Sequence, residues 1–298
     1  MFQEYYMAKS VSDALSFLNK EPGDAVIIAG GTDLLLDLQE GKKRTKSLVD
    51  ITRIPELRNL SQEYGIIKIG AAVTHAQVAE SELIWANAPA LAMAAKKVGS
   101  LQIRNIATVV GNIINAQPAA DTAVALTALG AKLTIADTSG TRDVHIEQLY
   151  EGVGKSKVDC RRELVTAIII PAHKQNQSSY FVRLEQRKAL ALPMLNIAVM
   201  VSLEEGQQRF EWVRIAMAPV GPRPMRATNA ESILKGAVID DEIITKAAYE
   251  AVAQANPRDS DLRGSREYRL QVLPALVKRC IAMAVAQVIK ADKEGGES

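Results

Sequence analysis

Cysteine is scarce in this chain, which has two cysteines among its 298 residues. Cys160 and Cys280 are far apart in sequence, so a disulfide framework is not expected and a reducing, cytoplasmic compartment fits the composition. Two thiols also cannot hold an iron–sulfur cluster, which needs about four cysteine ligands. Any such cluster must therefore lie on another chain.

Long blocks of one charge and long apolar runs are also missing. Charged residues make up 23% of the sequence and the formal net charge is +2, which does not favour nucleic acid or another polyanion as a partner. The first residues lack the pattern of a secretory signal, and no stretch reaches the roughly 18 apolar residues of a membrane span. We therefore expect a cytoplasmic protein with neither nucleic acid nor a membrane as a partner.

The residue types that usually carry catalysis form no pattern. The histidines are scattered without metal-ligand spacing, and the serines lack the G-x-S-x-G elbow of hydrolases. Arg161 and Arg162 beside Cys160 favour the thiolate, which predicts a lowered pKa for this cysteine. Because the thiol has no paired cysteine or base in the sequence, we assign no catalytic residue and no metal site.

What the chain does contain is enough apolar sequence for two or three packed subdomains, because 48% of its residues are hydrophobic. Helix and strand patterns alternate up to about residue 170, which indicates an α/β or α+β fold. A helix through Leu15 and Leu18, capped by Ser10 or Ser12, precedes a strand at Asp24–Ala29 that we expect to be buried. Further strands are expected at Ser47–Ile51, Gly65–Gly70, Ala131–Ala136 and Leu164–Ile170, and further helices around Ala76–Ala79 and at Ala88–Val98 and Ala119–Leu129.

The pattern changes after a linker at Pro171–Ser178. Three strand patterns then give way to two helical ones, which predicts an α+β chain whose C-terminal domain is a small antiparallel sheet covered by helices. The strands are expected at Tyr180–Gln186, Met194–Leu203 and Phe210–Ala218, and the helices at Asp240–Ala255 and Glu267–Ile289. The expected domains are residues 1–173, with subdomains of about 1–55 and 56–173, residues 178–290, and a flexible tail at 291–298.

Two glycines follow the strand expected at Asp24–Ala29. In the run Ala29–Asp33 (AGGTD), they let main-chain N–H groups approach a ligand without a Cβ in the way, and successive N–H groups in such a turn bind anions such as a pyrophosphate. The pattern is neither the G-x-G-x-x-G fingerprint nor a Walker A loop. The alternative is a tight turn in which Thr32 or Asp33 caps a helix.

A second candidate is the run Thr108–Asn112 (TVVGN), which we expect to lie in a loop, followed by Asp121. A hydroxyl, open main chain and a carboxamide can hold phosphate and the polar edge of a flavin, and a carboxylate can accept hydrogen bonds from ribose or ribitol hydroxyls. The alternative is that Asp121 caps the helix that begins nearby. Each motif is unspecific alone, whereas the pair is specific.

Three stretches together resemble one family: AGGTDLL near residue 30, QIRNIATVVGN from Gln102, and PAADT from Pro118. They are similar to the FAD-binding medium subunit of the xanthine dehydrogenase and carbon monoxide dehydrogenase family of molybdenum hydroxylases. The run RGSREYR from Arg263, which opens a long helix, resembles that family's C-terminal domain, so the likeness covers nearly the whole chain. It implies a two-part FAD-binding domain of the vanillyl-alcohol-oxidase/PCMH type, followed by the C-terminal domain described above.

The resemblance also implies roles for individual residues. Val26–Asp33 would wrap the FAD pyrophosphate, Thr108–Asn112 would form the second phosphate and flavin loop, and Asp121 would lie beside the ribityl chain. Residues lining the flavin or the adenine, and the loop Arg187–Leu192 near the isoalloxazine ring, would complete the site. The positions that match cofactor-binding residues of the family are Val26, Ile27, Ile28, Ala29, Gly30, Gly31, Thr32, Asp33, Val98, Thr108, Gly111, Asn112, Asp121, Leu164 and Arg183.

Two positions depart from the family pattern. Val110 replaces the first glycine of the usual Thr-x-Gly-Gly-Asn, which would crowd the main chain at the second loop. Arg183 stands where many relatives have a lysine, two residues after the aromatic position of Phe181, so the charge is kept but its shape is changed.

The function implied by the resemblance is that of a FAD-binding subunit, which passes electrons from iron–sulfur clusters on a partner through FAD to NAD or another acceptor. FAD is expected on this chain, molybdopterin on a large partner subunit, and 2Fe–2S clusters on a small one. Two alternatives remain open. One is a scaffold subunit in which Val110 has weakened flavin binding, and the other is a stand-alone flavin oxidase.

Overall fold

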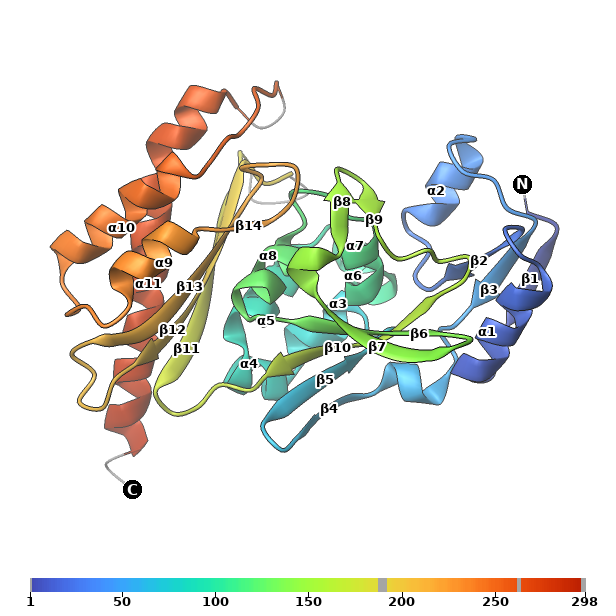
Figure 1. The fold of residues 1–298 in the computed structure, drawn as a ribbon, viewed down its shortest axis with the longest axis horizontal. Coiled ribbons are helices and arrows are strands. Elements are labelled where there is room, and N and C mark those ends of the chain that lie inside the picture. Colours follow the sequence, from blue (N-terminus) through green and yellow to red (C-terminus); the bar gives the residue numbers. More distant parts are fainter. Residues whose placement is uncertain (1, 187–191, 262–263, 296–298) are drawn as a thin grey trace. The chain divides into compact units, whose positions relative to one another are not determined.

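The structure, a computed structural model, describes residues 2–186, 192–261 and 264–295 (Figure 1). The chain forms two compact units that interleave along the sequence. Unit 1 consists of Met1–Val78, Ser100–Gln117 and Ala131–Pro171, and unit 2 of Ala79–Gly99, Pro118–Gly130 and Ala172–Ser298. The expected domains are continuous stretches of the chain that meet near residues 173 and 178, whereas these units are each made of three separate stretches. The expected boundaries therefore stay a prediction.

The first sheet of unit 1 is parallel, with the strand order β1-β3-β2. Its strands are β1 (Glu4–Met7), β2 (Ala25–Ile28) and β3 (Ser47–Asp50). Helix α1 (Val11–Lys20) begins at Ser10, whose hydroxyl accepts a hydrogen bond from the N–H of Asp13 at 3.1 Å. Because β2 lies at the edge of the sheet, Val26 and Ile27 are only half-buried. The prediction of a buried strand at Asp24–Ala29 is therefore right for Ala25 and Ile28 but not for the two residues between them.

The second sheet of unit 1 is antiparallel and has five strands in the order β4-β5-β10-β6-β7. Alternate residues of its central strands are buried, among them Ile67, Leu133 and Ile168, as expected for a sheet with a face against the core. The strands are β4 (Leu60–Glu63), β5 (Ile66–Gly70), β6 (Lys132–Asp137), β7 (Gly140–His145) and β10 (Leu164–Pro171). Three of them were expected from the sequence at these positions, within a residue or two.

Short elements connect these strands. Gly111 and Asn112 lie in a helix, not in the loop that we expected, because the Thr108 hydroxyl caps the helix and thereby outweighs their weak helical propensity. The short elements are α2 (Leu34–Gln39), η1 (Pro55–Arg58), α3 (His75–Glu80), α6 (Leu101–Ile106), α7 (Val109–Ile114), η2 (Ile146–Gln148), β8 (Tyr150–Gly152) and β9 (Lys155–Ser156).

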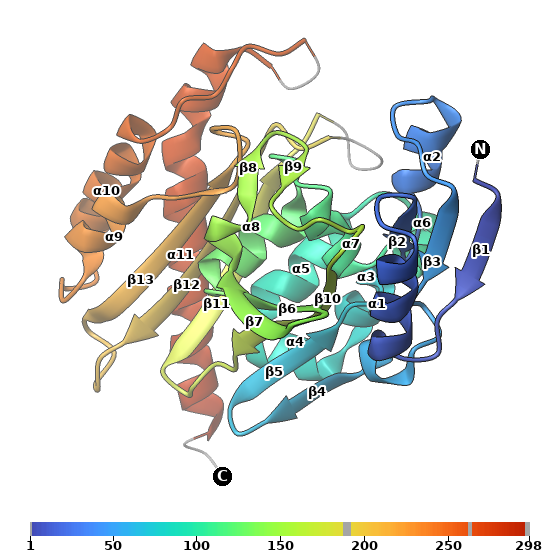
Figure 2. The same ribbon diagram turned by 45° about the vertical axis from the view of Figure 1, so that its right-hand side comes forward.

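Unit 2 is a four-stranded antiparallel sheet, ordered β11-β12-β13-β14, with helices on both faces. Helices α9, α10 and α11 lie on one face and α5 and α8 on the other, as Figures 1 and 2 show from two directions. Because both faces are covered, every residue of β12 is buried. The elements are α4 (Glu82–Asn87), α5 (Pro89–Lys97), α8 (Asp121–Ala128), β11 (Gln177–Leu184), β12 (Leu195–Leu203), β13 (Phe210–Ala218), β14 (Met225–Arg226), α9 (Thr228–Leu234), α10 (Asp241–Ala253) and α11 (Arg266–Gly295). The expected α+β fold with a helix-covered C-terminal sheet is confirmed.

Helix α11 bears on two expectations, of which the flexible tail at 291–298 stays a prediction. By length and composition, its stretch Arg266–Lys290 would suffice to cross a membrane, whereas the sequence had suggested no such stretch. Leu273, Cys280 and Ile281 are fully buried, and the helix packs against β11 and β12. Packing in the core thus accounts for part of its apolar composition, since 39% of its most apolar stretch is buried. The helix also continues to Gly295, into the segment that was expected to be a tail.

Candidate functional site

The two glycine-bearing segments predicted to act together meet within unit 1. A Cβ atom at Gly30 would lie 2.8 Å from the Cα of Ala107 and would also collide with the carbonyl oxygen of Ile106. Gly31, with φ of +68°, adopts a left-handed conformation that other residues rarely take. The main chain before Thr108 therefore passes so close to Gly30 that no side chain fits between them.

A side-chain hydrogen bond joins the same two segments. The Nδ2 of Asn115, which follows α7, donates to Oδ1 of Asp33 at 2.8 Å. Asp33 occupies the N-cap position of α2, but its carboxylate binds Asn115 and the Thr32 hydroxyl instead of capping the helix. The alternative that this turn serves only to cap α2 through Asp33 is therefore wrong.

The second segment is organised by Thr108. Its hydroxyl oxygen accepts a hydrogen bond from the N–H of Gly111 at 3.0 Å, and a Cβ at Gly111 would lie 2.9 Å from the same oxygen. Gly111 is exposed and Asn112 is half-buried. We name the segments Gly30–Asp33 and Thr108–Asn112 together the glycine turn site.

Val110, which departs from the family pattern, is buried. It is 6% exposed and thus counts among the core residues of unit 1. A side chain already covered by protein atoms takes little room from a ligand that approaches from solvent. The burial of Val110 therefore does not support the crowding of the second loop that we expected from this residue.

Leu164 and the strand residues before Gly30 lie in unit 1 as well. Leu164 is the first residue of β10, is buried, and pairs with Ala136 of β6. Val26, Ile27 and Ile28 form the end of the edge strand β2, and Ala29 is the half-buried residue that follows. Contact of these residues with a flavin or an adenine stays a prediction.

Three other predicted residues, Val98, Asp121 and Arg183, lie in unit 2. The Arg183 guanidinium donates to Oδ2 of Asp121 at 2.5 Å and to the carbonyl oxygen of Lys97, the residue before Val98, at 2.9 Å. The Nδ2 of Asn196 donates to Oδ1 of Asp121 at 2.8 Å. We name Asp121, Arg183 and Asn196 the Asp121 cluster. Asp121 begins α8 without serving as its N-cap residue, so the capping alternative is wrong here as well.

Burial controls the protonation of this cluster. Asp121 is 5% exposed, and burial raises its pKa to about 6, against the opposing effects of Arg183 and Asn196. Sequence reasoning missed Asn196. An available signal was its position as a polar residue in the apolar strand sequence LNIAVMVSL.

Cys160 does not have the lowered pKa that its arginine neighbours suggested. Burial, followed by the charge of Asp159, raises the pKa of its thiol to about 11. Arg161 instead donates to the carbonyl oxygens of Gly23 and Arg44. Its charge is thereby engaged by main-chain dipoles, and the raised pKa does not favour the thiolate at neutral pH.

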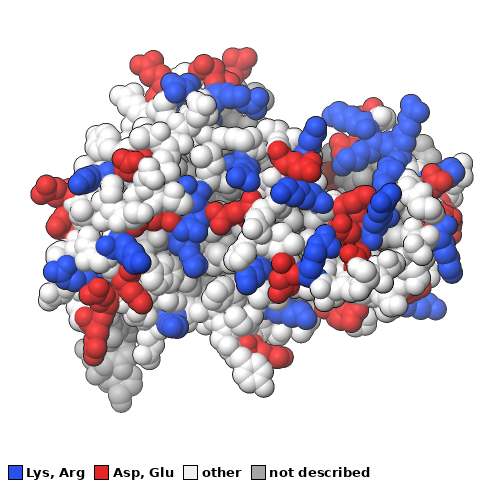
Figure 3. Space-filling model, viewed as in Figure 1, with Lys and Arg blue, Asp and Glu red and all other residues white. Residues whose placement is uncertain are grey.

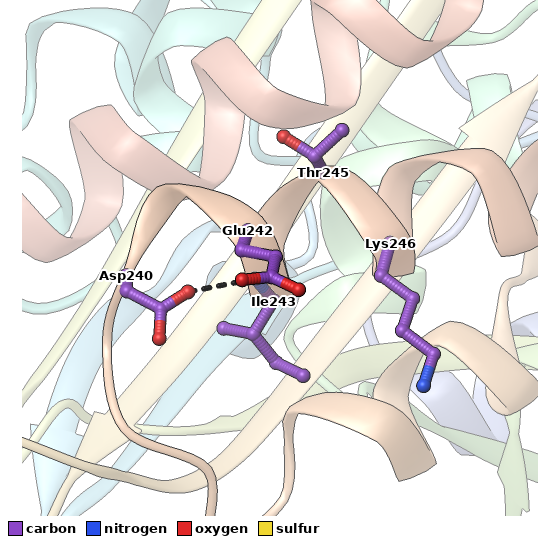
Figure 4. Close-up of a pocket in the computed structure, with 5 residues that line it drawn as sticks. All are labelled: Asp240, Glu242, Ile243, Thr245 and Lys246. Atoms are coloured by element: carbon purple, nitrogen blue, oxygen red, sulfur yellow. Dashed lines mark hydrogen bonds between the residues drawn. The ribbon is translucent and has the colours of Figure 1, made fainter.

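None of the residues that line a surface hollow on α10 is a predicted site residue (Figure 4). Its lining comes from the start of this one helix, where Oδ1 of Asp240 accepts the N–H of Ile243 at 2.8 Å as an ordinary N-cap. The lining residues are Asp240, Glu242, Ile243, Thr245 and Lys246. Within residues 2–186, 192–261 and 264–295, no group of three His, Cys, Asp or Glu side chains is placed to hold a metal ion. Residues 187–191 of the expected isoalloxazine loop Arg187–Leu192, and Arg263 of the C-terminal motif, lie outside the described residues.

Comparison with known proteins defines the class. Residues 1–173 match the family model described as FAD binding domain in molybdopterin dehydrogenase, and residues 180–284 match the CO dehydrogenase flavoprotein C-terminal domain. The fold is thus that of a FAD-binding subunit of a molybdopterin dehydrogenase.

Individual relatives narrow the class to a family. The chain is 32% identical to the xanthine dehydrogenase FAD-binding subunit of Escherichia coli O157:H7, over 96% of this chain and 97% of the relative. It is 28% identical to the carbon monoxide dehydrogenase medium chain of Hydrogenophaga pseudoflava, over 95% and 97%. A solved structure of carbon monoxide dehydrogenase from that organism superposes with a TM-score of 0.89 at 30% identity, covering 96% of this chain and 98% of that one. The chain belongs to the FAD-binding medium subunits of the xanthine dehydrogenase and carbon monoxide dehydrogenase family.

Proposed function

We propose that the glycine turn site holds the diphosphate of FAD, and that the chain relays electrons from an iron–sulfur partner subunit through this cofactor to NAD or another acceptor. The observation that carries the proposal is the close approach of Gly30 to Ile106 and Ala107. Glycine there lets the two segments pack main chain against main chain, because a side chain would collide with Ile106 and Ala107, and this packing would let N–H groups of both segments serve one anion.

Each predicted residue receives a role that its surroundings permit. The N–H groups of Gly30–Asp33 would bind diphosphate oxygens, and the Thr108 hydroxyl, which accepts from Gly111, keeps its own proton free to donate. Gly111 and Asn112 would extend this contact. In unit 2, the Asp121 carboxylate would accept hydrogen bonds from ribityl hydroxyls.

Apolar residues would surround the rings of the cofactor. Val26–Ala29, Val98 and Leu164 supply side chains of this kind, and Arg183 would hold the Asp121 carboxylate in place. Bound FAD supplies reversible uptake of one or two electrons, whereas the protein binds and orients it.

The partner subunits are inferred from the small number of cysteines in this chain and from the names of its relatives. Both cysteines are free thiols, too few for one cluster. Relatives are named as a medium chain of carbon monoxide dehydrogenase and as a subunit of a 6-hydroxypseudooxynicotine dehydrogenase complex. We infer a large subunit with molybdopterin and a small subunit with 2Fe–2S clusters, in the cytoplasm. The face shown in Figure 3 intersperses charges of both signs, which does not favour nucleic acid as a further partner.

The alternatives make different predictions. A scaffold subunit weakened by Val110 would gain FAD occupancy in Val110→Gly, whereas we expect no gain because Val110 is buried. A stand-alone flavin oxidase would turn over a substrate without partner subunits, whereas we expect reduction of the bound FAD to require the complete complex.

The decisive experiment is a titration of the purified full chain with FAD, followed by absorbance and fluorescence. We expect one FAD per chain, and we expect Gly30→Ala to lower the affinity at least about 100-fold, since its Cβ collides with main chain. Gly152→Ala is the matched control, because a Cβ at Gly152 meets nothing within 4 Å. Equal binding by both variants would contradict the proposal.

A further inference from the structure

Asn196 is a buried amide in a strand that is otherwise almost wholly apolar. Its side chain is 0% exposed, and its Nδ2 donates to Oδ1 of Asp121 at 2.8 Å and to the carbonyl oxygen of Ala119 at 3.2 Å. Both partners are acceptors, so the amide nitrogen rather than the oxygen must face them. An apolar residue would avoid the cost of burying this amide. The presence of Asn196 at this position is therefore better explained by its hydrogen bonds to Asp121 and Ala119 than by packing.

Asn196 and Arg183 lie directly opposite each other on neighbouring strands. They are register partners in the antiparallel pair β11 and β12, so their side chains emerge on the same face of the sheet. From there Arg183 reaches Oδ2 of Asp121 at 2.5 Å, while Asn196 reaches Oδ1. Each carboxylate oxygen is thus fixed by a different strand.

Further contacts hold the clamp itself in place. Arg183 also donates to the carbonyl oxygen of Lys97, at the end of α5, and Nζ of Lys97 forms an ion pair with Glu185 at 3.1 Å. The side chains of Arg183 and Asp121 are 5% and 6% exposed. Rotation of the carboxylate would break hydrogen bonds to both strands at once.

We propose that Asn196 is a positioning residue of the flavin site, which together with Arg183 clamps the Asp121 carboxylate in the orientation that receives the ribityl hydroxyls of FAD. This inference rests on the proposed function. It adds a residue that contacts Asp121 and acts on the cofactor only by orienting that carboxylate. The clamp leaves the remaining lone pairs of both carboxylate oxygens as the acceptors for the ribityl chain.

The test is a double-mutant cycle on the full chain, with FAD affinity as the readout. Asn196→Leu should weaken FAD binding about tenfold, the usual effect of losing a hydrogen bond to a charged group. In an Asp121→Ala background, the same substitution should have no further effect, because its action passes through that carboxylate. Additive losses would overturn the proposal.

A second readout separates positioning from general damage to the fold. ADP carries the diphosphate without a ribityl chain, so its affinity should change less than about twofold in Asn196→Leu. Ser179→Ala is the control, because it removes another fully buried polar group of the same sheet, which accepts from the N–H of Ala90. Equal losses for FAD and ADP would contradict positioning.

Two further outcomes are distinguishable. If Asn196→Leu does not fold, Asn196→Ser retains a small polar side chain and enters the same cycle. If the unmodified chain binds no FAD, the proposed function fails. If the chain binds FAD, and Asp121→Ala weakens it while neither Asn196 variant does, only the clamp is refuted.

Discussion

The glycine turn site and the Asp121 cluster are built from different materials. The first consists largely of main chain, and its two segments come close together because Gly30 lacks a Cβ. The second consists of charged and amide side chains that are almost completely buried, such as Asp121 at 5% exposure. A main-chain site recognises an anion of the right shape, whereas a clamped carboxylate selects hydroxyl donors. In the proposed function, anchoring of the cofactor and selection of its hydroxyl groups would therefore be carried by separate parts of the chain.

The largest expected effect comes from breaking the buried pair. Arg183→Leu leaves the Asp121 carboxylate without its cation and should lower the free energy of unfolding by about 3–5 kcal/mol. Arg142, which pairs with Asp137 and Glu163 and is 45% exposed, is the matched surface control. Arg142→Leu should cost less than about 1 kcal/mol. Urea unfolding of both variants measures the difference, and equal costs would show that the cluster is not buried in solution.

Acid should weaken unit 1 through His75. Its ring is 0% exposed, and burial, followed by the charge of Arg104, lowers its pKa from 6.5 to about 4. As the pH falls, the unfolded chain takes up a proton on His75 before the folded chain does. The contribution of the neutral ring to stability is therefore fully present above pH 6.5 and is lost as the pH falls toward 4. The loss should be on the order of 3 kcal/mol. His75→Leu should remove this part of the pH dependence in unfolding measurements from pH 7 to 4, and an unchanged slope would contradict the burial of the ring.

Asp121 should make stability depend on pH in the opposite direction to His75. Its pKa in the folded chain, about 6, lies above the ordinary value of 3.8. Its contribution to stability is therefore present below pH 3.8 and is lost as the pH rises through 6, on the order of 3 kcal/mol. Comparing the stability of Asp121→Asn with the unmodified chain from pH 4 to 7 isolates this contribution. A difference that stays constant with pH would mean that the carboxyl has an ordinary pKa.

A smaller effect is expected at the start of α7. Thr108→Ala removes the hydroxyl that accepts from the N–H of Gly111, and should cost about 1 kcal/mol of stability. Thr108→Ser keeps the hydroxyl and should remain within about 0.5 kcal/mol of the unmodified chain. FAD affinity should fall in the alanine variant alone. Loss of affinity in both variants would assign the effect to the methyl group instead.

The glycine turn site could be predicted from the sequence because it depends on local absence of side chains. Two glycines after a strand, and a threonine three residues before Gly111, are visible in the sequence. The helical state of Gly111 and Asn112 was missed, because the Thr108 cap outweighs their propensities. The bond between Asp33 and Asn115 was missed as well, since it joins residues 82 positions apart.

The Asp121 cluster could be predicted only in part. The resemblance pointed to Asp121 and Arg183 separately, but the strand register that places Arg183 opposite Asn196 is a tertiary feature. The pKa of Cys160 illustrates the same limit. Adjacent arginines in sequence suggested a thiolate, whereas the fold turns Arg161 toward the main chain of Gly23 and Arg44.

The central claim is that two segments of unit 1 hold one FAD diphosphate together. Hydrogen–deuterium exchange of the full chain, with and without saturating FAD, tests it most directly. We predict that amide protection rises in Gly30–Asp33 and in Val109–Asn112 at the same FAD concentration, and that Gly30→Ala abolishes both changes. Protection confined to one of the segments, or found only elsewhere while FAD binds, would contradict the account.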